Sequence, residues 1–335
     1  MLRTEASHFT PLSVFRSVGK KKSPSSRKAF SLLSRSFEDN LLRRLKTLNP
    51  PSFSFLWFSR AVHLLAETQA DAVELIGNQL RVLPGSEKSQ AWYLDGSVKV
   101  LDVCNSVFSD IENLMQGRLL VHFVIRVLEG SRFHSPEDLR RARECIVDCR
   151  ECFVGRSEKR TRQANAAGLV CELTRGLDNP SSGKITSVEK VVRRTLYAVQ
   201  AVTVFLLGVI VAVLEGLPNQ VAAPVPKDCF LWAAEFNSLQ SAVQGEIQRR
   251  LAGDKRLFLD EMEALEDSLR SVSDELVRED DGGVVAERAR DAVRELERTT
   301  EELSDGLDRL LHEVNGFFRR VLSTRSVLLE RIREE

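Results

Sequence analysis

Three cysteines in one short segment have the spacing of a metal-binding motif. Cys145, Cys149 and Cys152 follow a C-x3-C-x2-C pattern, which holds an iron–sulfur cluster in radical enzymes of the S-adenosylmethionine type. Such a cluster needs thiolates that converge from a loop. These cysteines instead fall on one face of a segment with helical periodicity, between charged residues, so we interpret them as small core residues. A zinc site is not expected, because no fourth ligand has a suitable spacing.

No other pattern in the sequence indicates catalysis. The five histidines are scattered singly, and none forms the H-E-x-x-H spacing of a zinc hydrolase. The sequence has no phosphate-binding loop, no dinucleotide fingerprint and no G-x-S-x-G elbow. Its carboxylates are spaced as solvated helix faces. We therefore expect a protein that is not an enzyme and that uses no cofactor.

Composition is typical of a globular protein in a reducing compartment. The chain has 335 residues, 43% hydrophobic and 29% charged, which is enough to bury a large core. Six cysteines, without the apolar N-terminal run of a signal peptide, favour a cytosolic or cytosol-facing protein. The net charge of zero hides a segregation of charge. Residues 1–36 carry eight basic residues and one acid, whereas residues 253–313 carry nine basic and twenty acidic residues.

The basic N-terminus is a candidate contact for lipid or for an adaptor protein. We predict that residues 1–28 form a disordered arm and that residues 29–335 form a single helical domain. Basic residues attract anionic lipid, and phosphorylation of a serine among them would reverse that attraction or recruit a phosphoserine-reading adaptor. With few aromatic residues interleaved, nucleic acid is not an expected partner. The same composition describes a plastid transit peptide, which stays open as an alternative. The candidate contact residues are Lys20, Lys21, Lys22, Ser23, Arg27 and Lys28.

Helical periodicity follows the arm almost without a break. A leucine stripe ends at Asn49-Pro50-Pro51, because proline disfavours the helical conformation of the residue before it. Further helices are expected over about 53–83 and 92–128, and Ser135-Pro136 is a good helix start. No run of residues requires a strand. The fold class is therefore all-α, a multi-helix bundle with long helices.

The C-terminal residues 255–333 have the clearest pattern. Apolar residues spaced alternately four and three apart form a seam on two segments separated by Asp280-Asp281-Gly282-Gly283, which predicts an antiparallel helical hairpin. We expect the hairpin to hold the fold together and to present an acidic outer face to a basic partner. The acids assigned to that face include Glu261, Asp267, Glu295 and Glu302.

Residues 195–214 are free of charge and long enough to cross a bilayer. Twenty helical residues span about 30 Å, roughly the thickness of the hydrocarbon core. Lys190, Arg193 and Arg194 lie on the N-terminal side only, so a spanning helix would keep that side in the cytosol. The candidate span residues are Thr195, Leu196, Phe205, Leu206, Leu207, Ile210 and Leu214.

The same residues are equally compatible with a core helix buried on all sides by amphipathic neighbours. Gln200, Thr203 and Gly208 make a mediocre membrane segment. The sequence leaves both interpretations open. The expected location is a membrane, through a single span or peripheral attachment facing the cytosol. The alternatives are a soluble cytoplasmic protein and a plastid protein.

Blocks of residues spread over about 30–333 resemble the plant BYPASS and Roh family. The resemblance is carried by the order of the blocks and not by any chemical motif. The blocks are Leu48-Asn49-Pro50 with Trp57, Glu67-Thr68-Gln69-Ala70-Asp71, Tyr93-Leu94-Asp95, Ser97-Val98-Lys99 with Leu101-Asp102, Leu231-Trp232-Ala233, Gly245-Glu246-Ile247, Val314-Asn315-Gly316-Phe317-Phe318 and Val321-Leu322-Ser323.

The resemblance implies a helical plant protein without established enzymatic activity. Members act in development, signalling or stress responses, and some bind the seventy-kilodalton subunit of the exocyst, a vesicle-tethering complex. The middle apolar segment of the family is commonly interpreted as a membrane span. We therefore expect a non-enzymatic regulatory protein at a cytosolic membrane face. The alternative is a regulator or enzyme in the synthesis of a small mobile signalling molecule.

Overall fold

The computed structural model describes residues 24–76, 87–130, 136–154, 166–177, 188–216, 225–226, 228–252, 257–277 and 284–334. Within these residues the regular structure is helical, which confirms the all-α fold class. The helices are α1 (Pro24–Lys46), α2 (Phe55–Glu74), α3 (Glu87–Gly130), α4 (Pro136–Val154), α6 (Ala166–Arg175), α7 (Val188–Glu215), α8 (Ala233–Ala252), α9 (Asp260–Val277) and α10 (Val284–Glu334).

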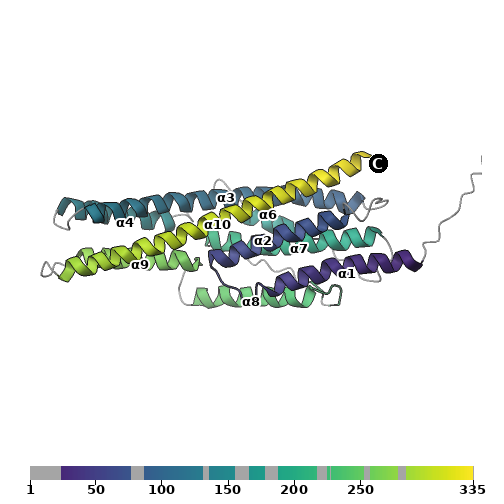
Figure 1. The fold of residues 1–335 in the computed structure, drawn as a ribbon, viewed down its shortest axis with the longest axis horizontal. Helices are drawn as coiled ribbons and strands as arrows, with labels where there is room; N and C mark the ends of the chain where they lie inside the picture. Colours follow the sequence, from purple (N-terminus) through teal and green to yellow (C-terminus); the bar gives the residue numbers. More distant parts are fainter. Residues whose placement is uncertain are drawn as a thin grey trace, which may run out of the picture.

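Two long helices, α3 and α10, run side by side through most of an elongated bundle (Figure 1). The shorter helices pack on them in two groups. At the hairpin end, α4 and α9 pack on the adjoining parts of α3 and α10. At the α7 end, α2, α6 and α7 pack on the remaining parts, α1 packs on α2 and α7, and α8 packs on α1. One bundle therefore has two ends of different construction.

The corner between α1 and α2 lies where the sequence predicts a helix end. Residues 47–53 turn the chain, and the Asn49–Pro50 peptide bond is cis. The Ser54 hydroxyl then accepts a hydrogen bond from the backbone N–H of Trp57 and caps α2. The second predicted helix begins at Phe55 and not at 53, and its expected last residues, 77–83, lie outside the described residues. The corner is buried, since Leu48 and Phe53 are both fully enclosed.

The C-terminal hairpin is confirmed, and its seam is buried on both helices. The buried seam residues are Met262, Leu265, Leu269, Val272 and Leu276 on α9, and Val293, Leu296, Thr300, Leu303, Leu307, Leu310, Val314, Phe317 and Val321 on α10. The two arms are unequal, because α9 has 18 residues and α10 has 51. The second half of the α10 seam therefore needs a different partner.

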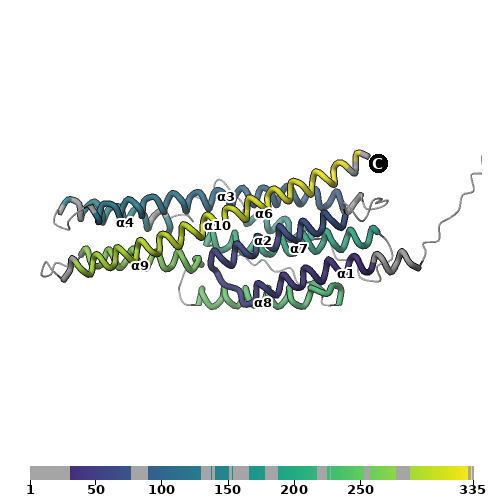
Figure 2. Tube along the Cα trace, in the orientation of Figure 1, coloured from purple at the N-terminus to yellow at the C-terminus, as the bar shows by residue number. Residues whose placement is uncertain are grey.

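That partner is α2, which follows α9 along the surface of α10 (Figure 2). The backbone N–H of Asp260 donates to the Phe53 carbonyl at 2.9 Å, so the start of α9 meets the start of α2. Close packing continues past this junction, because a Cβ added to Gly306 would lie 2.6 Å from the Phe55 ring. The Phe55 ring takes the space that a larger side chain at position 306 would need.

Candidate functional site

The helix α7 contains the candidate membrane span and lies in the interior of its end of the bundle. It is long and apolar enough to cross a membrane, yet its most apolar eighteen-residue window is 100% buried within the protein. All seven candidate span residues are buried, namely Thr195, Leu196, Phe205, Leu206, Leu207, Ile210 and Leu214. The structure thus gives this helix the environment of a protein core, which was the alternative left open by the sequence.

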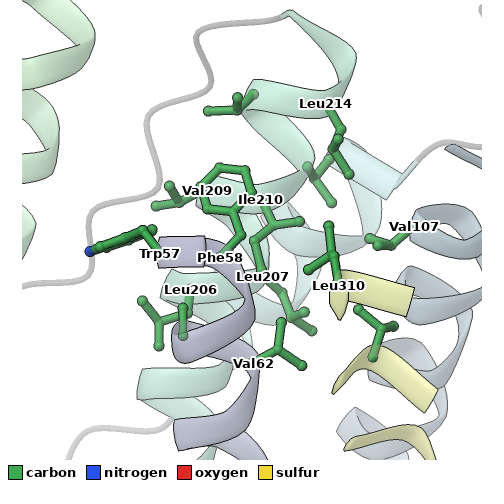
Figure 3. Packing of buried hydrophobic residues seen from close by; sticks show 14 of the residues in the cluster. Trp57, Phe58, Val62, Val107, Leu206, Leu207, Val209, Ile210, Leu214 and Leu310 are labelled. Carbon is green, nitrogen blue, oxygen red and sulfur yellow. The ribbon is translucent and has the colours of Figure 1, made fainter. Parts of the chain in front are cut away.

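Neighbouring helices cover α7 on different sides. Figure 3 shows Leu206, Leu207 and Ile210 of α7 together with Phe58 and Val62 of α2 and with side chains from α3 and α10. On the side of α8, the Phe205 and Phe236 rings meet edge to face, with centroids 5.4 Å apart. These contacts bury apolar side chains that would each contribute about 1.5–3 kcal/mol on leaving water.

Polar groups within α7 also find places inside the bundle. Gln200 is 5% exposed and lies against Gly96 of α3. A Cβ at position 96 would clash with the Gln200 amide, so the missing side chain lets the two helices approach closely. Gln200 thus packs against a neighbouring helix, and its buried Oε1 has no hydrogen-bond partner among the described residues.

Arg194 at the start of the uncharged run forms a buried ion pair with Glu38 of α1. Its Nη2 lies 2.6 Å from Glu38 Oε1, and the two side chains are only 10% and 5% exposed. Arg194 also donates to the Cys229 carbonyl at 2.7 Å and lies over the Phe230 ring. The second carboxylate oxygen of Glu38 accepts the backbone N–H of Leu231 at 2.9 Å. Burial with full pairing makes this a structural joint between α1, α7 and the segment before α8.

The joint changes the interpretation of Arg194. The sequence placed this residue in a basic flank that would face the cytosol beside a span. In the structure its guanidinium is inside the protein. Sequence reasoning missed Glu38 as its partner, because the two residues are 156 positions apart. The only available signal was a single acid in an otherwise apolar stripe of the first helix.

The basic arm is described only at its C-terminal end. Lys20, Lys21, Lys22 and Ser23 lie outside the described residues. Arg27 and Lys28 belong to the first turns of α1, which begins at Pro24. Helix therefore starts inside the range 1–28 for which the sequence predicts disorder. Proline is well suited to a first helical turn, since its missing N–H has no partner there in any case.

The cysteine motif lies on α4, a continuous helix, as its pattern predicts. Cys149 is fully buried, whereas Cys145 is half-buried. Burial raises the pKa of the Cys145 thiol, and Asp148 and Glu144 raise it further. The reactive thiolate form is therefore disfavoured. In the part of the chain that the structure describes, no group of three His, Cys, Asp or Glu residues is placed to hold a metal ion.

The proposed acidic outer face of the hairpin needs one correction. Glu261 does not lie on that face, because its carboxylate accepts the backbone N–H of Phe55 at 3.0 Å. Burial raises the pKa of Glu261, although its hydrogen bonds to backbone N–H groups act in the opposite direction. This acid joins α9 to the N-terminus of α2, where a carboxylate is favoured by the helix dipole.

The other acids of the face are exposed and paired with arginines of their own helix. Arg298 of α10 forms ion pairs with both Glu295 and Glu302. Asp267 lies 3.8 Å from Arg270 on α9. Exposed pairs of this kind contribute little to stability, about 0.3–0.5 kcal/mol each. Their carboxylates remain accessible to a partner.

Comparison with known proteins gives matches along nearly the whole chain. A sequence model of the family described as "Protein ROH1-like" matches residues 69–167 and 153–332. The Arabidopsis thaliana protein named "Protein BPS1, chloroplastic" is 29% identical over 326 residues, which cover 95% of this chain and 88% of that protein. "Protein ROH1D" of the same plant is 22% identical and covers 89% of this chain and 87% of that protein.

A rice protein is similar over a shorter region. "UPF0496 protein 4" of Oryza sativa subsp. japonica is 33% identical over 249 residues, or 72% of this chain. The aligned region covers 53% of that protein, so the chain spans about half of its length. No solved structure matches the chain at a significant level.

Proposed function

Because the chain belongs to the ROH1-like family, we propose that it is a plant regulatory protein without enzymatic activity that binds other proteins at a cytosolic membrane face. The resemblance drawn from the sequence is confirmed, since the relatives include both BPS1 and ROH1D. The names of these relatives state no enzymatic activity. The proposal concerns how such a protein reaches a membrane and what it binds there.

The burial of α7 is the observation that carries the proposal. A helix with all residues from Thr195 to Leu214 buried presents no apolar surface to lipid. Crossing a bilayer would require α7 to leave the contacts with α1, α2 and α3 and to break the Arg194–Glu38 pair. The favoured attachment is therefore peripheral, with the bundle intact.

Peripheral attachment assigns the membrane contact to the basic arm. Lys20, Lys21, Lys22, Arg27 and Lys28 would each contribute about 1 kcal/mol near an anionic leaflet. At physiological ionic strength this attraction extends only about 8 Å, so the arm must lie against the headgroups. Phosphorylation of Ser23 would weaken it by adding negative charge, or would create the site for a phosphoserine-reading adaptor.

Protein partners are proposed for the exposed faces of the bundle. The family resemblance implies an exocyst subunit as the partner class, and the exposed carboxylates of α9 and α10 offer a surface for a basic segment of such a partner. Asp267 and Glu302 are 68% and 54% exposed. The acid excess of residues 253–313 supports a basic partner rather than an acidic one.

Vesicle sedimentation of the full chain tests peripheral attachment. The chain should sediment with phosphatidylcholine vesicles that contain phosphatidylserine, and it should stay in the supernatant when the five basic residues of the arm are changed to glutamine. A matched control changes five exposed arginines of the bundle: Arg140, Arg141, Arg288, Arg290 and Arg319. Equal loss of sedimentation in both variants would show that general charge, and not the arm, causes binding.

A plastid is the second location that a specific observation favours. The relative BPS1 is named chloroplastic, and the first 36 residues of this chain are rich in basic residues and contain one acid. A fluorescent fusion to the C-terminus of the full chain distinguishes the two locations. Signal inside plastids that disappears when residues 1–23 are deleted would support import, whereas signal at the plasma membrane or in the cytosol would support the cytosolic face.

A further inference from the structure

A solvent-facing cavity of about 570 Å³ lies between α1, α2 and α10. Residues of α2 form most of its wall, including Leu56, Ser59 and Arg60. Arg44 of α1 and Arg309 of α10 complete it. The volume is within the range of about 300–1,000 Å³ that is usual for small-molecule sites.

The acids of the cavity already have partners, whereas two of its arginines do not. Glu67 lies 3.5 Å from Arg44 Nη2, and Glu313 lies 3.1 Å from His63 Nδ1. Among the residues that the structure describes, Arg60 and Arg309 form no hydrogen bond or ion pair. Two guanidinium groups of the cavity are therefore outside any ion pair, and the Glu67 and Glu313 carboxylates lie in the same cavity.

Ser59 is a further polar group without a partner. It is 3% exposed, and its buried hydroxyl makes no hydrogen bond within the described residues. Helical serine and threonine hydroxyls commonly bond the carbonyl four residues earlier, as Thr68 of the same helix does with Leu64 at 2.7 Å. An unsatisfied buried hydroxyl is unfavourable for folding. Ser59 also lines the cavity, so its hydroxyl is the uncharged donor closest at hand for a molecule bound there.

We propose that this cavity binds a phosphate monoester carried on a small apolar body. The guanidinium groups of Arg60 and Arg309 are outside any ion pair and would attract a phosphate dianion, which guanidinium groups bind with two parallel hydrogen bonds. The exposed Leu56 side chain and the neighbouring Leu64 offer an apolar contact for the rest of the ligand. The site is independent of the basic arm and of the proposed membrane function.

Calorimetric titration of the full chain with phenyl phosphate tests the site. Saturable binding is expected, and the double variant Arg60→Gln, Arg309→Gln should bind at least about tenfold more weakly. The matched control is Arg290→Gln, Arg319→Gln, which changes two exposed arginines of α10 outside the cavity and should alter affinity by less than about twofold. Absence of saturable binding, or equal affinities in the two double variants, would overturn the proposal.

Ser59→Ala separates a ligand contact from a structural role. It removes an unsatisfied hydroxyl, so the unfolding temperature should be unchanged or higher while phenyl phosphate binds less tightly. An unchanged affinity would remove Ser59 from the site. Benzoate, which carries a single negative charge, is the comparison ligand. If benzoate binds as tightly as phenyl phosphate, recognition of a phosphate dianion is contradicted.

Vesicles distinguish a soluble ester from a lipid headgroup. Phosphatidic acid in phosphatidylcholine vesicles presents the same phosphate monoester on a membrane. Weaker sedimentation of the cavity variant than of its matched control would assign the site to a headgroup, since both variants retain the arm. Binding of phenyl phosphate without that difference would assign it to a soluble ester.

Discussion

The two ends of the bundle bury their apolar residues in different ways. At the hairpin end, α9 and α10 each bury one seam, with Leu269 and Leu296 almost fully enclosed and charged residues on the outer faces. At the α7 end, one helix is buried on every side over the twenty residues 195–214. The spacing of apolar residues in an amphipathic helix shows which face is buried. A helix that is apolar on every face gives no such information.

This difference explains why the sequence predicted the packing of the hairpin end but did not predict the environment of α7. A lipid environment and a protein core both accept a helix like α7, so composition cannot distinguish them. The distinction lies in the neighbours, because α1, α2, α3 and α6 pack around α7 and cover it. The structure therefore favours a core helix over a membrane span, two interpretations that a hydropathy profile does not distinguish.

A charge placed inside α7 is expected to give the largest effect. Leu207→Arg would bury an unpaired guanidinium in a site that is 1% exposed. The cost should equal or exceed the whole stability of about 5–15 kcal/mol that is usual for a domain. We expect no cooperative thermal transition by circular dichroism. The control Leu119→Arg, on an exposed face of α3, should melt like the unmodified protein.

A folded Leu207→Arg protein with an unchanged melting temperature would contradict the claim that α7 is buried on every side. It would show that α7 is an accessible surface and not the centre of its end of the bundle.

Breaking the buried joint should have the next largest effect. Glu38→Gln leaves the Arg194 charge without its counter-charge and should lower the free energy of unfolding by about 3–5 kcal/mol in urea titrations. The neighbouring Asp39→Asn removes a pair with Arg35 that is exposed, with the two charged atoms 3.9 Å apart. That control should change stability by less than about 1 kcal/mol. Similar losses of unfolding free energy in both variants would mean that the buried pair contributes no more to stability than the exposed one.

Truncating a buried side chain in the centre of the hairpin seam should lower the stability of the protein. Leu269 is 1% exposed, so Leu269→Ala should cost about 2–5 kcal/mol of unfolding free energy. Ser271→Ala on the outer face of α9 is the control and should be nearly neutral. A melting temperature that Leu269→Ala leaves unchanged would remove the hairpin from the core and make the α7 end the sole source of stability.

The junction of the two ends should give the smallest effect, and one that depends on pH. The pKa of Glu261 is raised by burial above its ordinary value of 4.5, so the folded state holds this proton more tightly than the unfolded state. The Glu261 contribution to stability is then greatest below pH 4.5 and is lost as pH rises through the folded pKa. The difference in melting temperature between the unmodified chain and Glu261→Gln should therefore fall across that window. A difference that increases with pH would contradict the raised pKa.

Much of the fold was predictable because its patterns are local. The seam residues, the helix end before Pro50 and the helix across the cysteine motif follow from spacing within one segment. The division of the α10 seam between α9 and α2 was not predictable. It depends on the meeting of Asp260 with Phe53, and no local pattern records that contact.

The candidate site was less predictable for the same reason. Residues 195–214 could be identified, but their burial depends on helices from four other parts of the chain. The pairing of Glu38 with Arg194 could not be identified, because the two residues are 156 positions apart. The cavity combines the consecutive helices α1 and α2 with the distant helix α10, so Arg60 and Arg309 carried no signal in the sequence alone.

Alkaline carbonate extraction tests the central claim that α7 is a core helix of an intact bundle. Membranes from plant cells that express the full chain are treated with carbonate and centrifuged beside an integral membrane marker. The burial of residues 195–214 predicts that the chain is released to the supernatant while the marker stays in the pellet. Retention of the chain in the pellet together with the marker would contradict the claim and would make α7 a membrane span.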